Sequence, residues 1–423
     1  MGPRFRHFTS FLLTFVLTFL TSLLFSILVA CGSSNPSSSG SGSTGGSGGS
    51  GGGSGGSGGG GGTGSGGGSG SGGGTSSTSS NVAYAYVGAN GTITGYAVQS
   101  NGTLTAVPGS PYAGPAESPV TNGSYLFADD LSEPNGTISG GQKIGVYTLN
   151  KQNGALALQS SSTGVSTSNS VLMSLSLDHT GQFLYASENG NNGVSDIETF
   201  DVSNGIQGAA LAETTGSPYF GARISFSPDN RYAYGVGCWH GAFAIYSLSR
   251  ASNGTLTALA NTGTVPQQND NDQYCGYSVA VSAQNYLALS YTSGVPGSPI
   301  SLALYTINSD GSLTLAQNTA VATASMQHAV IGFDPSGKYL ACAGDGGVQV
   351  FQLSAASLTV LPGSPQTVGV SFEDVQWDHN GHVFASSDSN LYVYTFANGT
   401  LTAQGAPYAG GGMLTVPRLA PLD

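Results

Sequence analysis

The chain has 423 residues, of which 7% are charged, and 21 acidic residues against nine basic ones give it a net charge of −12. An acidic surface repels nucleic acid and anionic lipid headgroups, so both are excluded as partners. Four cysteines in a chain of this length also exclude a disulfide scaffold.

The first 30 residues have the features of an export signal. Arg4 and Arg6 precede an uncharged apolar run over 11–30, which ends in small residues directly before Cys31. We predict a signal peptide over 1–30; a retained transmembrane anchor is the alternative, because about 20 apolar residues can span a bilayer.

The junction at Cys31 resembles the lipobox of bacterial lipoproteins. That resemblance implies that Cys31 becomes the lipidated N-terminus, and Gly32 after it favours the outer membrane over the inner one. The implied location is the bacterial cell envelope, on the periplasmic or the outer surface. Beyond Cys31, the stretch up to residue 80 is almost entirely Gly and Ser, which predicts a disordered tether with a span of about 40 Å.

A short pattern then repeats through residues 81–423. It begins as Asn-Gly-Thr-Leu-Thr at Asn101, and its relatives start 42 to 57 residues apart at Asn153, Asn204, Asn253, Asp310, Ala356 and Asn398. Seven copies at this period indicate a repeat architecture. The Asn-Gly-Thr triplets also match the N-glycosylation sequon, but after a bacterial leader we interpret them as tight turns.

Each repeat contains four short apolar or alternating stretches. In the unit from Ala329 to Pro365, strands are predicted on both sides of the Asp334-Pro-Ser-Gly turn, followed by a third over 348–353 and a fourth over 358–361. No stretch after Cys31 shows sustained helical periodicity. The sequence therefore predicts an all-β, seven-bladed β-propeller with four antiparallel strands per blade.

The ends of the repeat region predict how the ring closes. The first unit begins at Val82 with a stretch that matches the second strand of the other units, and Met413 begins an unaccompanied first strand. We expect the C-terminal strand to join blade one, which would remove open sheet edges.

Residues 82–418 resemble the seven-bladed lactonase family, which includes 6-phosphogluconolactonase-like and carboxymuconate-cyclase-like proteins. The stretch from Phe183 to Asn189 is similar to the family's Tyr-Val-x-Asn-Glu motif and places Glu188 at its glutamate. The family's Gly-Pro-Arg-His motif is divided here between Arg223 and His328. The resemblance implies lactone hydrolysis, with Arg223 holding a substrate carboxylate or phosphate and Glu188 or His328 acting as general base or acid.

Antiparallel topology places the entry to each first strand and the loop between strands two and three on one face of the ring. Besides the three residues above, this face is predicted to collect polar residues that are candidates for ligand contacts: Asp129, Asp130, Asn189, Trp239, His240, Asp272, Gln273, Tyr274, Asp345, Glu373, Asp374 and Asp388. The alternative is that these are solvated loop residues around the mouth of the propeller.

No metal site or cofactor is expected. An acidic face suits Ca²⁺, but the chain has no Asp-x-Asp-x-Asp-Gly loop, no Cys/His spacing for zinc and no Gly-x-Ser-x-Gly elbow. Cys238 and Cys275 fall on the same face in adjacent blades and are predicted to be able to form a disulfide, whereas Cys342 is expected to be a buried thiol.

Two functions follow from this sequence. The first is a lipid-anchored binding or interaction module whose loop-lined mouth takes a small molecule, a glycan or another envelope protein. The second is a lactonase that opens a sugar or carboxylic lactone. We expect a monomer that meets the membrane only through its lipid. A purely structural repeat is the third possibility, and the presence of a pocket at the mouth distinguishes it from the other two.

Overall fold

The chain divides into two units, Met1–Gly74 and Thr75–Asp423. The computed structural model describes residues 81–129, 143–161, 170–190, 195–206, 210–217, 223–236, 244–260, 263–266, 274–293, 300–320 and 329–415, all within the second unit. The predicted signal peptide, Cys31 and the tether lie outside these ranges. Within them, no helix is long and apolar enough to cross a membrane.

The described residues form seven antiparallel sheets, each with four principal strands, and no helix. From the channel outward, the strands are, in blade 1, β31 (Met413–Thr415), β1 (Asn81–Ala89), β2 (Thr92–Gln99) and β3 (Leu104–Ala106) with β4 (Tyr112–Ala113); in blade 2, β5 (Glu117–Thr121), β6 (Tyr125–Asp129), β7 (Ile144–Leu149) and β8 (Leu156–Ser161); in blade 3, β9 (Ser170–Leu177), β10 (Phe183–Gly190), β11 (Ser195–Asp201) and β12 (Ala212–Ser217); in blade 4, β13 (Ser225–Phe226), β14 (Tyr232–Val236), β15 (Ala244–Arg250) and β16 (Leu256–Ala258) with β17 (Gly263–Thr264).

The remaining three blades follow the same order. Their strands are, in blade 5, β18 (Tyr274–Val281), β19 (Tyr286–Ser293), β20 (Ser301–Ile307) and β21 (Leu313–Ala320); in blade 6, β22 (Val330–Phe333), β23 (Tyr339–Gly344), β24 (Gly347–Ser354) and β25 (Ser357–Val360); in blade 7, β26 (Asp374–Trp377), β27 (His382–Ser386), β28 (Asn390–Ala397) and β29 (Thr400–Ala403) with β30 (Tyr408–Ala409). The predicted all-β propeller of seven blades is confirmed.

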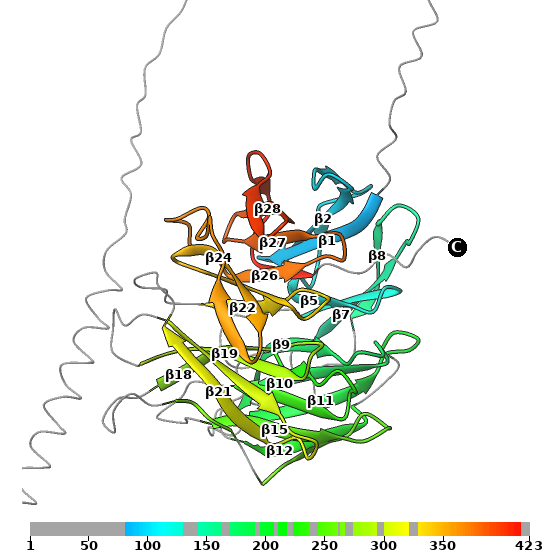
Figure 1. The fold of residues 1–423 in the computed structure, drawn as a ribbon. Helices are drawn as coiled ribbons and strands as arrows, with labels where there is room; N and C mark the ends of the chain where they lie inside the picture. Colours follow the sequence, from blue (N-terminus) through cyan, green and yellow to red (C-terminus); the bar gives the residue numbers. More distant parts are fainter. Residues whose placement is uncertain are drawn as a thin grey trace, which may run out of the picture. The chain divides into compact units, whose positions relative to one another are not determined.

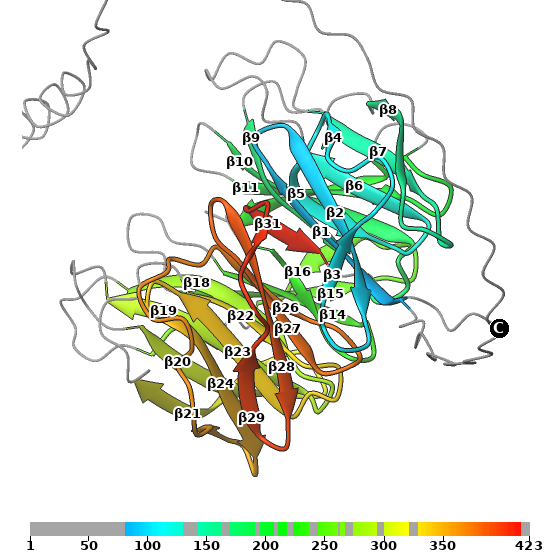
Figure 2. The same ribbon diagram turned by 90° about the horizontal axis from the view of Figure 1, so that it is seen from above.

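The C-terminal strand closes the ring, as the sequence predicts. β31 pairs with β1 in antiparallel register, with Leu414 opposite Val87. Figure 2 shows red β31 beside blue β1, and Figure 1 shows that blade 1 lies next to blade 7. Buried residues of β1, β2, β27, β28 and β31 form one apolar cluster between these two blades. The first and last parts of the propeller therefore share a core.

The core consists of apolar layers between adjacent blades. In β10, Leu184 and Ala186 pack against blade 2, whereas Tyr185 packs against blade 4. This follows from the alternation of side chains along a strand, which gives each blade two buried faces. The blades thus stack through side chains, and the described strands of different blades do not pair with one another.

The repeated Asn-Gly turns join the third and fourth strands of a blade, and several of them contact the preceding blade. Gly254, with a φ of +85°, has no room for a side chain, because a Cβ there would lie 2.5 Å from Cδ1 of Phe183 in blade 3. Its carbonyl accepts a hydrogen bond of 2.9 Å from the hydroxyl of Tyr185. Gly154 and Gly311 sit in the same way against tyrosines of the preceding blade. The turn glycines therefore set the spacing between blades.

The asparagine of these turns takes two conformations. At Asn90 and Asn398 both turn residues have positive φ, as expected for a tight Asn-Gly hairpin. At Asn101 only the following glycine does, and the Asn101 side chain accepts a hydrogen bond of 3.0 Å from the N–H of Thr103. The turn prediction is confirmed, with side-chain capping as a second role of the asparagine.

Candidate ligand site in the central channel

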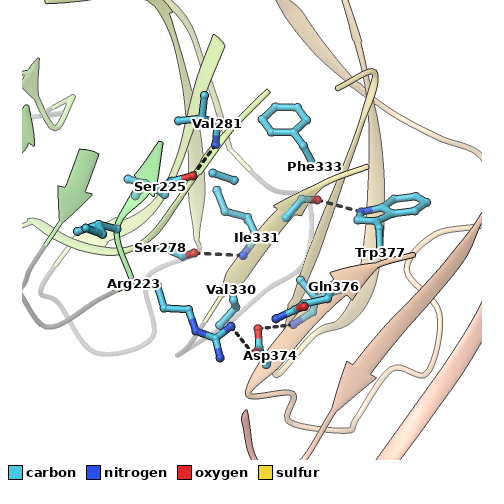
Figure 3. Close-up of a pocket in the computed structure, with 15 residues that line it drawn as sticks. Arg223, Ser225, Ser278, Val281, Val330, Ile331, Phe333, Asp374, Gln376 and Trp377 are labelled. Carbon is cyan, nitrogen blue, oxygen red and sulfur yellow. Dashed lines mark hydrogen bonds and ion pairs between the residues drawn. The ribbon is translucent and has the colours of Figure 1, made fainter. Parts of the chain in front are cut away.

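The structure contains a cavity of about 320 Å³ in the central channel, between the inner strands of blades 4 to 7. Its lining residues come from β13, β18, β22, β26 and the residues just before β13: Arg223, Ile224, Ser225, Ser278, Val279, Ala280, Val281, Val330, Ile331, Gly332, Phe333, Asp374, Val375, Gln376 and Trp377. Figure 3 shows Arg223 and Asp374 together at one end and Phe333 toward the other. We call the Arg223 end the mouth, since the inner strands begin there.

Most polar groups along the cavity wall bond to the neighbouring blade. The innermost strand of each blade has one edge that pairs with no further strand in the described residues. Serine side chains of neighbouring blades accept hydrogen bonds from some of the backbone N–H groups along this edge. The hydroxyl of Ser225 accepts from the N–H of Val281 at 3.1 Å, and that of Ser176 in β9 accepts from Ile224 at 3.0 Å. The indole N–H of Trp377 donates to the carbonyl of Gly332 at 3.0 Å (Figure 3). The wall therefore presents both polar and apolar surface to a ligand.

Arg223 and Asp374 form an ion pair across the mouth. Nη1 of Arg223 lies 2.7 Å from Oδ2 of Asp374, and the arginine side chain is 24% exposed while the aspartate is 1% exposed. The same Oδ2 accepts the N–H of Leu414 at 2.9 Å, and Nη2 of Arg223 donates to the carbonyl of Leu414 at 3.4 Å. The guanidinium is thus neutralised locally and bound to the ring-closing strand.

Three further carboxyl groups lie on the mouth face near Asp374. Glu373 precedes β26 and is hydrogen-bonded to Asp388 in the loop between β27 and β28. Burial, followed by the hydrogen bond and charge of Asp388, raises the pKa of Glu373 to about 7, with Glu117 and Asp374 adding to the shift. Oε1 of Glu117 accepts the N–H of Asn90 at 2.6 Å, and burial raises the Glu117 pKa. The mouth is strongly acidic.

Glu188, the glutamate predicted to be catalytic, lies away from the cavity at Arg223. Glu188 is 1% exposed and lies on β10, two residues beyond Ala186, so alternation turns it toward blade 2. Asp129, also 1% exposed, lies two residues beyond Phe127 on β6 and faces blade 3. These two carboxyl groups therefore face the same interface between blades 2 and 3. Glu188 does not line the cavity at Arg223.

The other predicted site residues divide into three groups. Asp345, Glu373, Asp374 and Asp388 are placed by the structure, and Asp345 accepts a hydrogen bond from the hydroxyl of Ser371. For Asn189, Tyr274 and Cys275 the strands are described but the side chains are not. The remaining predicted residues lie outside the described ranges: Asp130, Trp239, His240, Asp272, Gln273, His328, Cys31 and Cys238.

Sequence reasoning missed Glu117 and the cavity-lining Gln376. Glu117 begins β5 and therefore fits the topological rule for the mouth, but a register shift between Glu117 and Val120 and a positive φ at Ser118 obscure its strand. Gln376 donates from Nε2 to the carbonyl of Leu414. Its position two residues after Asp374 on an inner strand is the signal that would have identified it.

The cysteine and metal predictions are tested only in part. Cys342 is fully buried and unpaired, as expected, and burial raises its pKa to about 12. The Cys238–Cys275 disulfide stays a prediction. In the described part of the chain, no group of three or more His, Cys, Asp or Glu side chains is arranged to hold a metal ion.

A scan of protein families identifies a family for this chain. The family described as "Lactonase, 7-bladed beta-propeller" matches residues 75–367, which is more than half of the chain. A search of the curated proteins found no match.

Solved structures give the same fold at low sequence identity. The periplasmic gluconolactonase PpgL of Pseudomonas aeruginosa superposes with a TM-score of 0.63 at 14% identity, over 80% of this chain and 99% of that one. A candidate 6-phosphogluconolactonase of Bacteroides uniformis gives 0.62 at 13%, over 80% and 100%, and one of Bacteroides fragilis gives 0.60 at 16%, over 80% and 99%. At these identities the likeness establishes the fold and nothing finer.

Proposed function

Because the chain belongs to the seven-bladed β-propeller family of lactonases, we propose that it is an extracytoplasmic member that binds a small ligand in the channel cavity. The observation that carries the proposal is the cavity of about 320 Å³ with the Arg223–Asp374 pair at its mouth. Ligand sites are typically concave and carry a few polar groups that orient the ligand, and this cavity has both properties.

The ion pair between Arg223 and Asp374 favours binding over catalysis. Its charge is offset by Asp374 at 2.7 Å, so it is not poised to stabilise negative charge that develops in a reaction. Glu188 lies between blades 2 and 3 and is not among the residues that line the cavity. The described residues thus support a ligand pocket better than a catalytic group.

The proposal includes a lipid anchor at Cys31 and a location in the bacterial cell envelope. The arginines before residues 11–30 and the small residues before Cys31 support an exported lipoprotein. The periplasmic location of the Pseudomonas aeruginosa protein of the same fold is consistent with it. Metabolic labelling with an alkyne fatty acid, followed by a Cys31→Ser comparison, tests the anchor: label that persists in the variant contradicts it.

The binding function is tested by filling the cavity. Val330 lines the cavity and is half-buried, so Val330→Phe should occupy the space and reduce affinity at least about tenfold in calorimetric titrations of the full chain with sugars and sugar lactones. Val360→Phe is the matched control, because Val360 lies on the outer strand β25 and is 44% exposed. Absence of binding across the panel, or equal affinity in Val330→Phe, would contradict the proposal.

A second candidate function is lactone hydrolysis with Glu188, Arg223 and His328. The family match favours it, and the carboxyl groups at the mouth provide further acid and base groups. Removing a general base typically lowers the rate by about 100-fold or more, so Glu188→Gln should reduce kcat/KM for a lactone by that amount. Glu213→Gln on the exposed part of β12 serves as the control. Hydrolysis that is unchanged in Glu188→Gln rejects the role of Glu188.

A further inference from the structure

We infer that the carboxyl groups at the mouth act as a charge filter, so that the cavity takes an uncharged, hydroxyl-bearing ligand and rejects phosphorylated or carboxylated ones. This inference rests on the proposed binding function. It extends that function from the presence of a pocket to the chemical class of its ligand.

The balance of charge at the mouth is the first observation. Arg223 is the one described cation that lines the cavity, and Asp374 neutralises it at 2.7 Å. Glu117, Asp388 and, above its pKa of about 7, Glu373 then add negative charge with no cation bonded to them in the described residues. Lys143, the other described cation on this face, is exposed and precedes β7, the third strand outward in blade 2.

The surroundings of these carboxyl groups are the second observation. Glu117 and Glu373 are partly buried, so the solvent screens their charges less than those of exposed side chains. Glu373 and Asp388 share a proton in their hydrogen bond, so the pair carries one negative charge below the Glu373 pKa of about 7 and two above it. An anion approaching Arg223 would meet this repulsion without gaining an unpaired cation.

A neutral ligand with several hydroxyl groups meets no such repulsion and can form hydrogen bonds at the mouth. The side chain of Arg223 is 24% exposed and presents N–H donors, and a hydroxyl oxygen can accept from them without bringing a charge into the cavity. The apolar side chains of Val330, Ile331 and Phe333 among the lining residues suit the carbon face of a sugar ring or lactone (Figure 3). No net charge has to be desolvated for such a ligand to enter.

The test compares matched neutral and anionic probes. Calorimetric titrations of the full chain would use glucose with glucose 6-phosphate, galactose with galacturonate, and inorganic phosphate alone. In the double variant Glu373→Gln/Asp388→Asn, affinity for the anionic probes should rise roughly tenfold at low salt, with neutral probes unchanged. The gain should shrink at high salt, because screening already weakens the repulsion in the wild type.

Asp310→Asn is the matched control, since Asp310 lies in the turn between β20 and β21 on the opposite face and asparagine can keep its hydrogen bonds to Ser312. Wild-type protein that binds an anionic probe as tightly as its neutral partner overturns the filter. So does a folded double variant that gains no anion affinity. If neutral probes fail to bind while the double variant gains anions, the cavity is a binding site but the uncharged ligand class is wrong; if no probe binds either protein, the proposed binding function itself fails.

Discussion

Arg223 and Asp374 join blades 4 and 7 across the central channel, although 151 residues separate them in the chain. The Asp374 oxygen that pairs with Arg223 at 2.7 Å also accepts the N–H of Leu414 at 2.9 Å. The Asp374 carboxylate in blade 7 therefore connects Arg223, at the start of blade 4, to β31, the strand that closes the ring. This gives Arg223 a structural role besides its position at the cavity.

Loss of this carboxylate should destabilise the closed ring. Asp374→Ala would leave the Arg223 charge and the Leu414 N–H without their partner, and breaking such a buried pair costs about 3 kcal/mol. Urea unfolding of the full chain would measure the free energy of unfolding. Asp345→Ala, which removes an exposed hydrogen bond to Ser371 on the same face, should cost less than about 1 kcal/mol. Equal losses in the two variants would contradict the role of Asp374.

Glu373 should make the propeller less stable as the pH rises toward neutrality. Its pKa is about 7 in the folded chain against 4.5 for an ordinary glutamate, so the folded state holds the proton more tightly. Between these two values the unfolded state releases the proton first, and the free energy of unfolding falls as the pH rises. Glu373→Gln should flatten this slope and raise the melting temperature at pH 8 with little change at pH 4.

Asp310 provides a contrast within the same experiment. Hydrogen bonds from Ser312 lower the pKa of Asp310, so its contribution to stability is present above its ordinary pKa of 3.8 and is lost on acidification. The free energy of unfolding of Asp310→Ala should therefore lie below that of the wild type at neutral pH and approach it at low pH. For Glu373, the contradicting result is a pH dependence of the free energy of unfolding in Glu373→Gln that runs parallel to that of the wild type, because Glu373 would then titrate like an ordinary glutamate.

The turn glycine Gly254 should tolerate no side chain. Gly254→Ala combines the cost of a positive φ, about 1 kcal/mol, with a Cβ placed 2.5 Å from the ring of Phe183. We expect a total loss above about 2 kcal/mol in thermal or urea unfolding. Gly399→Ala isolates the backbone cost, because Gly399 has a φ of +77° and no atom within 4 Å of its added Cβ. Similar losses at the two positions would exclude packing on Phe183 as the cause.

The Cys342 thiol should be unreactive in the folded protein. It is fully buried, and its pKa of about 12 keeps it protonated near neutral pH, whereas the thiolate is the reactive form. Ellman's reagent should label Cys342 only after denaturation, as judged by peptide mass spectrometry. Labelling of Cys342 in the native chain at a rate close to that of a free thiol would show that blade 6 opens readily.

The fold was predictable because it depends on local patterns that repeat. The turns and alternating strands identify each blade, and the unmatched stretches at Val82 and Met413 predict the closure. The site was less predictable, since the pairing of Arg223 with Asp374 depends on how far an arginine reaches across a ring of this size. Which side of blade 3 buries Glu188 likewise follows from the packing of Ala186, which composition does not reveal.

The short strand β31 also determines when the protein can finish folding. β1 is the first described strand to be synthesised, yet it pairs with β31, the last described strand. Until then β1 has an exposed edge, and contacts this distant in sequence form slowly. Nascent or truncated chains that lack β31 are therefore the species most exposed to aggregation, and a chaperone that covers the edge of β1 would protect them.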